Sequence, residues 1–355
     1  MDDSPLVSVV MPAYKSASFI GETIDGLLAQ TYPNWELICI DDGSPDNLGE
    51  VVSAYGDPRI HVFRLARNSG ICVATNEGFS KARGKYIVMM DNDDVSFPER
   101  IATQVAFLEA NPEIDGCGSQ HITLSPSIAW DKLRALRKTV FSHFVSDGET
   151  SASMLFGGLV FNPTVCFRTK LLKTVDVWFD PALSVGFDND FYDRLVMAGA
   201  KFVVLPDALI RYRVLNTSYS HRRQQSVREN SNRRVLGVVR KLVPFPTAEQ
   251  ERLHRLVFRE ASSLVPDELP KLQEWFDVLL KANKERQFFA EKSLLKILAW
   301  HWEGACASAC STNLFLALHE RKNFLLLQPY FKSTLAFLYR WQKRFFCRKR
   351  TRPKQ

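Results

Sequence analysis

The 355-residue sequence has no apolar run long enough to span a membrane. Its most apolar late stretch, residues 294–318, is interrupted by Lys296, His301 and Glu303, whereas a spanning helix needs roughly 18 uninterrupted apolar residues. The amino-terminal residues are acidic and lead directly into a strand pattern, so no signal peptide is indicated. We therefore expect a cytoplasmic protein that is soluble or peripheral on the inner face of the membrane.

Paired cysteine patterns are also missing. The seven cysteines are odd in number, scattered along the chain and often set in apolar runs, which is typical of buried free thiols in a reducing compartment. Cys306 and Cys310 lie one helical turn apart but lack a second pair of ligands, so we expect no zinc site.

Acidic residues are absent after Glu320, where eleven Lys and Arg residues follow. The net charge of +7 therefore belongs to the tail, because the first 320 residues hold 35 basic against 39 acidic side chains. This distribution argues against a protein that coats nucleic acid over its whole surface, and we expect no nucleic-acid partner.

The carboxy-terminal tail combines charge with aromatic residues. Residues 330–347 interleave seven aromatic residues with basic ones, a composition suited to the headgroup region of an anionic bilayer. We expect residues 321–355 to contact an anionic membrane surface. A helix packed on the body, followed by a solvated tail, is one alternative, and a basic arm for nucleic acid is the other.

The composition is otherwise that of a globular protein, with 46% hydrophobic, 12% aromatic and 24% charged residues. Strand and helix patterns alternate along the first hundred residues. The strand patterns cover 6–11, 36–40, 60–65 and 86–90, and the helical patterns run from Ser18 to before Pro33 and over 71–82. This alternation predicts an α/β fold with a doubly wound, mainly parallel sheet and helices on both faces.

Two of these strands end in acidic clusters. Asp41 and Asp42 follow the second strand, and Asp91-Asn92-Asp93-Asp94 follows the fourth. Ligands bind at the carboxyl ends of strands in such sheets, and neighbouring carboxylates repel one another unless a cation lies between them. Mg²⁺ or Mn²⁺ with its phosphate ligand is the usual solution. For the first pair, a turn that caps the next helix is an equally favoured interpretation.

Five short motifs follow one another in a familiar order. They are Pro12-Ala13-Tyr14, Asp41-Asp42-Gly43-Ser44, Arg67-Asn68-Ser69-Gly70, Ala82-Arg83-Gly84 and Asp91-Asn92-Asp93-Asp94. In this order and spacing they resemble the nucleotide-sugar half of family-2 glycosyltransferases with the GT-A fold, the type that builds bacterial cell-surface polysaccharide or lipopolysaccharide. The resemblance covers roughly residues 5 to 220.

The resemblance implies roles for these residues. It assigns donor binding to Pro12, Ala13, Tyr14, Asp41, Asp42, Arg67, Asn68, Arg83, Asp91 and Asn92. The first three would line the nucleoside pocket, and an acid of the Asp41/Asp42 pair would bind the base. Asp93, with Asp91, would ligate the Mn²⁺ or Mg²⁺ ion that bridges the donor diphosphate.

A second acidic segment, at residues 186–195, is similar to the acceptor-side motif of the same family. The alignment places the catalytic base at Asp188, which would take the proton of the acceptor hydroxyl in an inverting transfer. Phe187 and Asn189 stand where the family has Glu and an aromatic residue, so Asp190 is a rival base. The alternative is an N-capped surface helix.

Pro244-Phe245-Pro246 interrupts the chain after the acceptor segment, and helical patterns then cover 247–264, 266–283 and 284–300. We expect a GT-A domain at residues 1–225 and a helical region at residues 226–355 that ends in the basic, aromatic tail.

The predicted function is that of an inverting, metal-dependent glycosyltransferase of the hexosyltransferase type. It would move a sugar from a nucleotide donor to a hydroxyl of a saccharide or lipid-linked saccharide acceptor. A non-catalytic nucleotide-sugar-binding or scaffold protein is the first alternative, because Phe187 and Asn189 depart from the family motif. A nucleotidyltransferase is the second, although residues 11–15 lack the glycine of a phosphate loop.

Overall fold

The computed structural model describes residues 4–124, 145–158, 160–176, 178–183, 185–214, 224–259, 263–310, 317, 320–322 and 327. Almost all of the tail at 321–355 thus lies outside the described residues. The chain divides into two compact units. One comprises 1–150 with 159–230, and the other comprises 151–158 with 231–355. The sequence gives no sign that 151–158 belongs with the later helices.

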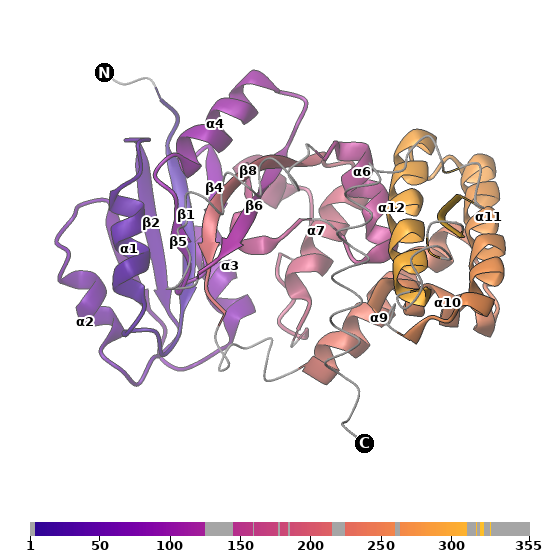
Figure 1. Cartoon of the computed structure of the whole chain (residues 1–355). Coiled ribbons are helices and arrows are strands. Elements are labelled where there is room, and N and C mark those ends of the chain that lie inside the picture. Colours follow the sequence, from indigo (N-terminus) through magenta and orange to yellow (C-terminus); the bar gives the residue numbers. More distant parts are fainter. Residues whose placement is uncertain are drawn as a thin grey trace. The chain divides into compact units, whose positions relative to one another are not determined.

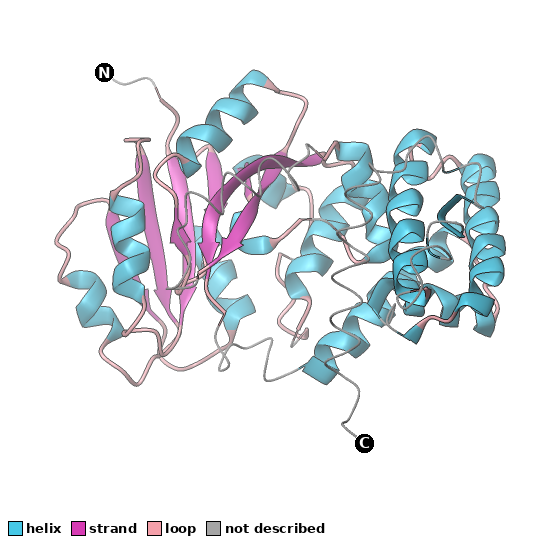
Figure 2. Cartoon of the chain, in the orientation of Figure 1, coloured by secondary structure: helices cyan, strands magenta, loops and turns pink. Residues whose placement is uncertain are grey.

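The first unit is built on one eight-stranded mixed sheet (Figures 1 and 2). Its strands are β1 (Val7–Ala13), β2 (Trp35–Asp41), β3 (Ile60–Arg64), β4 (Tyr86–Met89), β5 (Val95–Ser96), β6 (Gly116–Thr123), β7 (Cys166–Arg168) and β8 (Phe202–Tyr212). They lie in the order β3-β2-β1-β4-β7-β6-β8-β5. The first four pair in parallel, as do β6 and β8, whereas β7 and β5 are antiparallel to their neighbours.

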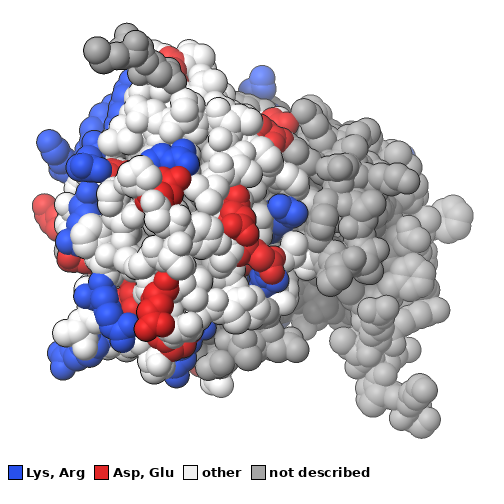
Figure 3. All heavy atoms as spheres, turned by 90° about the vertical axis from the view of Figure 1, so that its left-hand side faces the viewer, with Lys and Arg blue, Asp and Glu red and all other residues white. Residues whose placement is uncertain are grey.

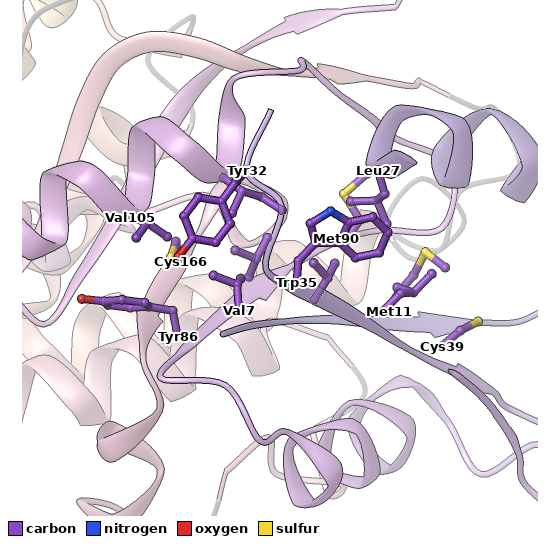
Figure 4. Close-up of a cluster of buried hydrophobic side chains, with 14 of the residues drawn as sticks. Val7, Met11, Leu27, Tyr32, Trp35, Cys39, Tyr86, Met90, Val105 and Cys166 are labelled. Atoms are coloured by element: carbon purple, nitrogen blue, oxygen red, sulfur yellow. The ribbon is translucent and has the colours of Figure 1, made fainter. Parts of the chain in front are cut away.

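Helices cover both faces of this sheet. They are α1 (Ile20–Leu28), α2 (Leu48–Ser53), α3 (Ile71–Lys81), α4 (Arg100–Ala110) and α7 (Phe187–Met197). Alternate residues of each strand point to opposite faces. Val7 and Met11 pack with Leu27 of α1 and Val105 of α4 in the cluster of Figure 4, while Val10 packs with α3 and α7. The predicted doubly wound α/β fold is confirmed.

The structure departs from the sequence prediction at two strands. The sequence pattern of residues 161–168 is strand-like, but Asn162–Thr164 is a 3-10 turn and only Cys166–Arg168 pairs in the sheet. Pro163 explains this, because it has no N–H for a strand ladder. Strand β6 was not predicted. Its Gly116 weakens the strand pattern, yet a Cβ there would lie 2.4 Å from the ring of Phe202.

Among the described residues, the remaining α-helices are α6 (Asp147–Ala152), α9 (Gln224–Leu242), α10 (Ala248–Arg259), α11 (Leu269–Arg286) and α12 (Glu291–Ala309). The expected carboxy-terminal helical region is therefore confirmed, although the predicted boundary between 283 and 284 is wrong. Helix α11 continues to Arg286 and ends where Gln287 takes a left-handed conformation, with a φ of 52°. The side chain of Asn283 bonds both the N–H and the carbonyl of Phe289 and so fixes the turn into α12.

The predictions about membrane-spanning segments and about the cysteines can be compared with the described residues. Within the ranges given above, no helix combines the length and apolar character that crossing a membrane requires. The six cysteines in those ranges are free and buried, as predicted. Acidic and basic side chains share the face of the protein shown in Figure 3.

A buried histidine ties residues 151–158 to the helices of the second unit. The indole N–H of Trp275 donates to Nδ1 of His254 (3.1 Å), so the ring proton sits on Nε2, which bonds the carbonyl of Leu155 (2.6 Å). Burial lowers the pKa of His254 to about 4. The His254 ring is therefore neutral in the folded protein at neutral pH.

We expect the second unit to lose stability as the pH falls from about 6.5 to 4, because the unfolded chain binds the His254 proton more tightly than the folded one. The loss at pH 4 should be about 3 kcal/mol. Urea unfolding at several pH values measures it. His254→Gln keeps one donor and one acceptor without a titrating ring, and it should remove this pH dependence. An equal dependence in the variant would contradict the assignment.

Candidate functional site

The carboxyl ends of the parallel strands bring several predicted residues to one edge of the sheet. Ala13 and Asp41 are register partners at the ends of β1 and β2. The N–H of Asp42 donates to the carbonyl of Ala13 (2.9 Å), and Nδ2 of Asn92 donates to the carbonyl of Pro12 (2.9 Å). The first three motifs and the acidic loop that follows β4 therefore adjoin one another.

The first acid pair organises two loops. Asp41 is fully buried and accepts hydrogen bonds from Nη1 of Arg64 (2.9 Å) and the N–H of Ser44 (2.7 Å). Asp42 accepts from the N–H groups of Ser69 (2.7 Å) and Gly70 (2.8 Å). Asp41 thus holds its own turn, in line with the turn interpretation, and Asp42 fastens the second loop beside it.

Gly43 allows those two loops to approach closely. Its φ is +64°, and a Cβ there would lie 2.5 Å from the carbonyl carbon of Arg67. Any side chain would push the Arg67-Asn68 loop away, and the left-handed backbone would add strain. Arg67 and Asn68 are exposed on that loop, and Tyr14 is 39% exposed at the end of β1. These three side chains can therefore meet a ligand.

Arg83 does not join this group. Its guanidinium pairs with Glu36, and its N–H bonds Oγ of Ser8 (3.1 Å). Ser8 and Glu36 lie at the amino ends of β1 and β2, about 16 Å along the strands from the acidic edge at 3.3 Å per residue. The structure therefore places Arg83 away from the predicted donor-binding residues, where it ties the end of α3 to the sheet.

The loop at residues 91–94 is fixed by Arg213. The N–H of Arg213 donates to Oδ1 of Asp94 (2.9 Å), and its Nε donates to the carbonyl of Asp93 (2.9 Å). Thr23 adds a hydrogen bond to the carbonyl of Asp94 (2.8 Å). Asp94 directly precedes strand β5, so the loop is held on the side of both Thr23 and Arg213.

The carboxylates of this loop carry more negative charge than their surroundings offset. Burial, followed by the charges of Asp93 and Asp188, raises the pKa of Asp91 to about 7. Burial raises the pKa of Asp93 against the opposing effects of its own N–H and of Arg213. Burial and the charge of Asp91 raise the pKa of Asp94 to about 9. This loop favours either protons or a cation.

A divalent cation fits this loop if phosphate oxygens complete its coordination. The described part of the chain contains no group of three or more His, Cys, Asp and Glu residues arranged to hold a metal ion. Mg²⁺ is commonly held by one or two carboxylates together with substrate phosphates and water. Asp91 and Asp93, with their raised pKa values, supply such a partial set.

Helix α7 carries the second acidic segment to the same place. It starts after Gly186, whose φ is +73°, and Asp188 lies in its first turn. Nδ2 of Asn189 donates to Oδ1 of Asp188 (3.2 Å). The charge of Asp188 raises the pKa of Asp91, so the two carboxylates lie within electrostatic reach. An acidic side chain in the first turn interacts favourably with the helix dipole.

Asp190 occupies a different environment on the same helix. Its Oδ2 accepts hydrogen bonds from Nε (2.9 Å) and Nη2 (2.8 Å) of Arg194, one turn later. Its carboxylate is thus neutralised within the helix. Of the two candidate bases, Asp188 is the one whose charge acts on the acidic loop.

Two groups that position the site were missed in the sequence. Arg100 at the start of α4 is fully buried, and its Nη2 donates to the carbonyls of Met89 and Pro163 (both 2.8 Å). The hydroxyl of Tyr192 donates to Oδ1 of Asn162 (2.9 Å). These contacts link the end of β4, the turn before β7 and helix α7. An arginine among apolar helix positions was the available signal for the first group, and no sequence pattern indicated the second.

Known proteins resemble this chain in sequence and in fold. A model of the family "Glycosyl transferase family 2" matches residues 8–156. The Bacillus subtilis protein EpsE, which carries a glycosyltransferase name, is 31% identical over 191 residues, covering 50% of this chain and 67% of EpsE. This chain belongs to the family-2 glycosyltransferases. An uncharacterized glycosyltransferase of Haemophilus influenzae is 28% identical over 239 residues. The match covers 64% of this chain and 73% of the Haemophilus protein.

A solved structure supports the fold of this family-2 glycosyltransferase. The S. aureus protein TarS, residues 1–349 in complex with UDP-GlcNAc, aligns with a TM-score of 0.56 at 17% identity, covering 98% of this chain and 93% of that one. Family membership makes the chain an enzyme that transfers sugar. The predictions of a scaffold protein and of a nucleotidyltransferase are thereby set aside.

Proposed function

We propose that this enzyme transfers a sugar from a nucleoside diphosphate donor to a hydroxyl of a saccharide or lipid-linked saccharide, with inversion and with Mn²⁺ or Mg²⁺. The observation that carries the proposal is the electrostatic reach of Asp188 to Asp91. This interaction brings a candidate base close to the carboxylates that would hold the cation of the donor diphosphate. Residues 1–225 would form the catalytic domain, and the tail at 321–355 would meet the anionic inner face of the membrane.

Each group has a role in that reaction. Pro12, Ala13 and Tyr14 would line the nucleoside, with Asp42 holding the neighbouring loop in place. Asp91 and Asp93 would hold the cation, which neutralises the diphosphate and stabilises it as it leaves. Asp188 would take the proton of the acceptor hydroxyl as its oxygen attacks the anomeric carbon from the face opposite the diphosphate.

A panel of nucleoside diphosphate sugars tests this function. TarS was crystallised with UDP and with UDP-GlcNAc, so uridine donors come first. We expect one nucleotide class to raise the melting temperature in Mn²⁺ and to lose this effect in EDTA. NMR of the product should show the inverted anomer. A retained anomer would refute inversion, and stabilisation that is equal in EDTA would refute metal dependence.

A further inference from the structure

Three aromatic rings gather at the carboxyl edge of the sheet. They belong to His121 of β6, Phe161 before the 3-10 turn and Tyr212 at the end of β8. The ring centroids of His121 and Phe161 are 4.8 Å apart, those of Phe161 and Tyr212 are 5.2 Å apart, and those of His121 and Tyr212 are 5.7 Å apart. Each side chain is half-buried. We call these three residues the aromatic trio.

The aromatic trio adjoins the acidic site. Tyr212 directly precedes Arg213, which bonds Asp94 and Asp93. Burial and the charges of Asp91, Asp94 and Asp93 raise the pKa of Tyr212 to about 12, so this ring lies within the field of the acidic loop. On the other side, Phe161 directly precedes Asn162, which accepts the hydroxyl of Tyr192 from helix α7.

The strand order places the aromatic trio across the acids from the nucleoside residues. Along the sheet, β2 and β1 carry Asp41 and Ala13, β4 leads into Asp91, and β7, β6 and β8 follow. Two strand spacings separate β4 from β6, a distance of about 10 Å. A sugar held at the acids therefore has a nucleoside subsite on one side and three rings on the other.

The proposed roles in donor binding leave this second side unassigned. The nucleoside and diphosphate are accounted for by the residues of β1, β2 and the acidic loop. A pyranose ring offers a flat face of C–H groups with hydroxyls at its rim. The face of an aromatic ring carries partial negative charge and buries apolar groups, and the neighbouring carboxylates can accept hydrogen bonds from the hydroxyls.

We propose that the aromatic trio is a stacking platform for a pyranose ring of the acceptor saccharide. This inference rests on the proposed function and specifies its acceptor, which would be a pyranoside whose attacking hydroxyl points towards Asp188. The rings of Phe161 and Tyr212 meet edge to face at 74°, so one of them supplies the face on which the pyranose stacks and the other forms a wall beside it. The ring of His121 packs against both.

Saturation-transfer NMR on the full chain tests the platform, with methyl pyranosides of several configurations as the probes. In the presence of UDP and Mn²⁺, we expect transfer to ring C–H protons of at least one pyranoside. Phe161→Leu and Tyr212→Leu should weaken that binding roughly three- to tenfold, as expected for the loss of one aromatic contact. Tyr212→Phe keeps the ring and should weaken that binding less than Tyr212→Leu does.

Phe63→Leu is the matched control, because Phe63 is a 37% exposed aromatic residue on edge strand β3, far along the sheet from β6. It should leave pyranoside binding unchanged. Absence of transfer to every pyranoside, or equal binding by Phe161→Leu, would overturn the platform. If Phe161→Leu reduces saturation transfer only to the sugar of an intact UDP-sugar, the rings bind the donor. That result would also overturn the platform. Failure of the proposed function would appear separately, as a loss of donor stabilisation in the wild type.

Discussion

Replacing Asp188 by asparagine is expected to lower the rate of sugar transfer by about 10²- to 10⁴-fold, the usual contribution of a positioned general base. Asparagine has the same shape, and its amide oxygen can still accept the hydrogen bond from Nδ2 of Asn189. The helix should therefore keep its structure. Steady-state kinetics with a labelled donor gives the loss in kcat.

Donor binding should survive the same substitution. The carboxylate of Asp188 raises the pKa of Asp91 through like-charge repulsion, so its removal lowers that pKa and relieves repulsion of the donor diphosphate, while Asp91 and Asp93 remain to hold the cation. A donor dissociation constant within a few-fold of wild type, measured by thermal shift or calorimetry, is the expected result.

Asp190→Asn is the control with the same change of charge on the same helix. It breaks the ion pair with Arg194, which is partly exposed and worth about 1 kcal/mol or less. We expect near-normal kcat. If Asp190→Asn abolishes transfer while Asp188→Asn turns over as the wild type does, the base is Asp190.

The choice between these two aspartates shows what the sequence could not decide. Both lie in the first turn of α7, where either carboxylate would be favoured by the helix dipole. Residues two apart on a helix point roughly 200° away from one another, so only one of them can face the acidic loop. Which one does so depends on the packing of Phe187 and Phe191 against the sheet, and that packing is a tertiary property.

Strands with a continuous apolar pattern were predictable. Val7–Ala13 and Trp35–Asp41 are buried along their whole length, so burial on both faces left a clear signal. Strand β6 was not predicted because Gly116 at its start allows close packing against Phe202 and has a low strand propensity. Local sequence patterns indicate which strands are buried. They do not indicate where a neighbouring side chain leaves room only for glycine.

Arg83 and Arg100 show the same limit at the level of single residues. Arg83 belongs to a motif that the resemblance groups with donor binding, yet register places it at the amino ends of the strands beside Glu36. Arg100 stands among apolar helix positions, a sign of burial that does not identify its partners. It lies buried with hydrogen bonds to the carbonyls of Met89 and Pro163, and burial lowers its pKa to about 10. The positions of both arginines depend on contacts between segments that are far apart in the sequence, and no short stretch of sequence contains that information.

Asp91→Asn should abolish the stabilisation that a donor gives in Mn²⁺ or Mg²⁺, and Asp93→Asn should weaken it in the same way. Each variant removes one of the two carboxylates that would hold the cation, and few protein ligands remain to replace it. The measurement is the melting temperature with and without cation at a fixed concentration of UDP-sugar. Unchanged cation dependence in both variants would place the cation elsewhere.

The same Asp91→Asn variant should behave oppositely when no cation is present. The pKa of Asp91 is raised to about 7, so the folded state binds this proton more tightly than the unfolded chain, whose carboxyl titrates near 3.9. Stability without cation therefore falls as the pH rises from about 4 towards 7, and the ionised carboxylate remains a cost above pH 7. Asparagine avoids that cost, so the cation-free variant should unfold at a higher urea concentration than the wild type at pH 8. A cation-free variant that is less stable than the wild type at pH 8 would show that Asp91 supports the fold itself. If Asp91→Asn is more stable without cation and also loses cation-dependent donor binding, the carboxylates of the acidic loop repel one another until the cation binds.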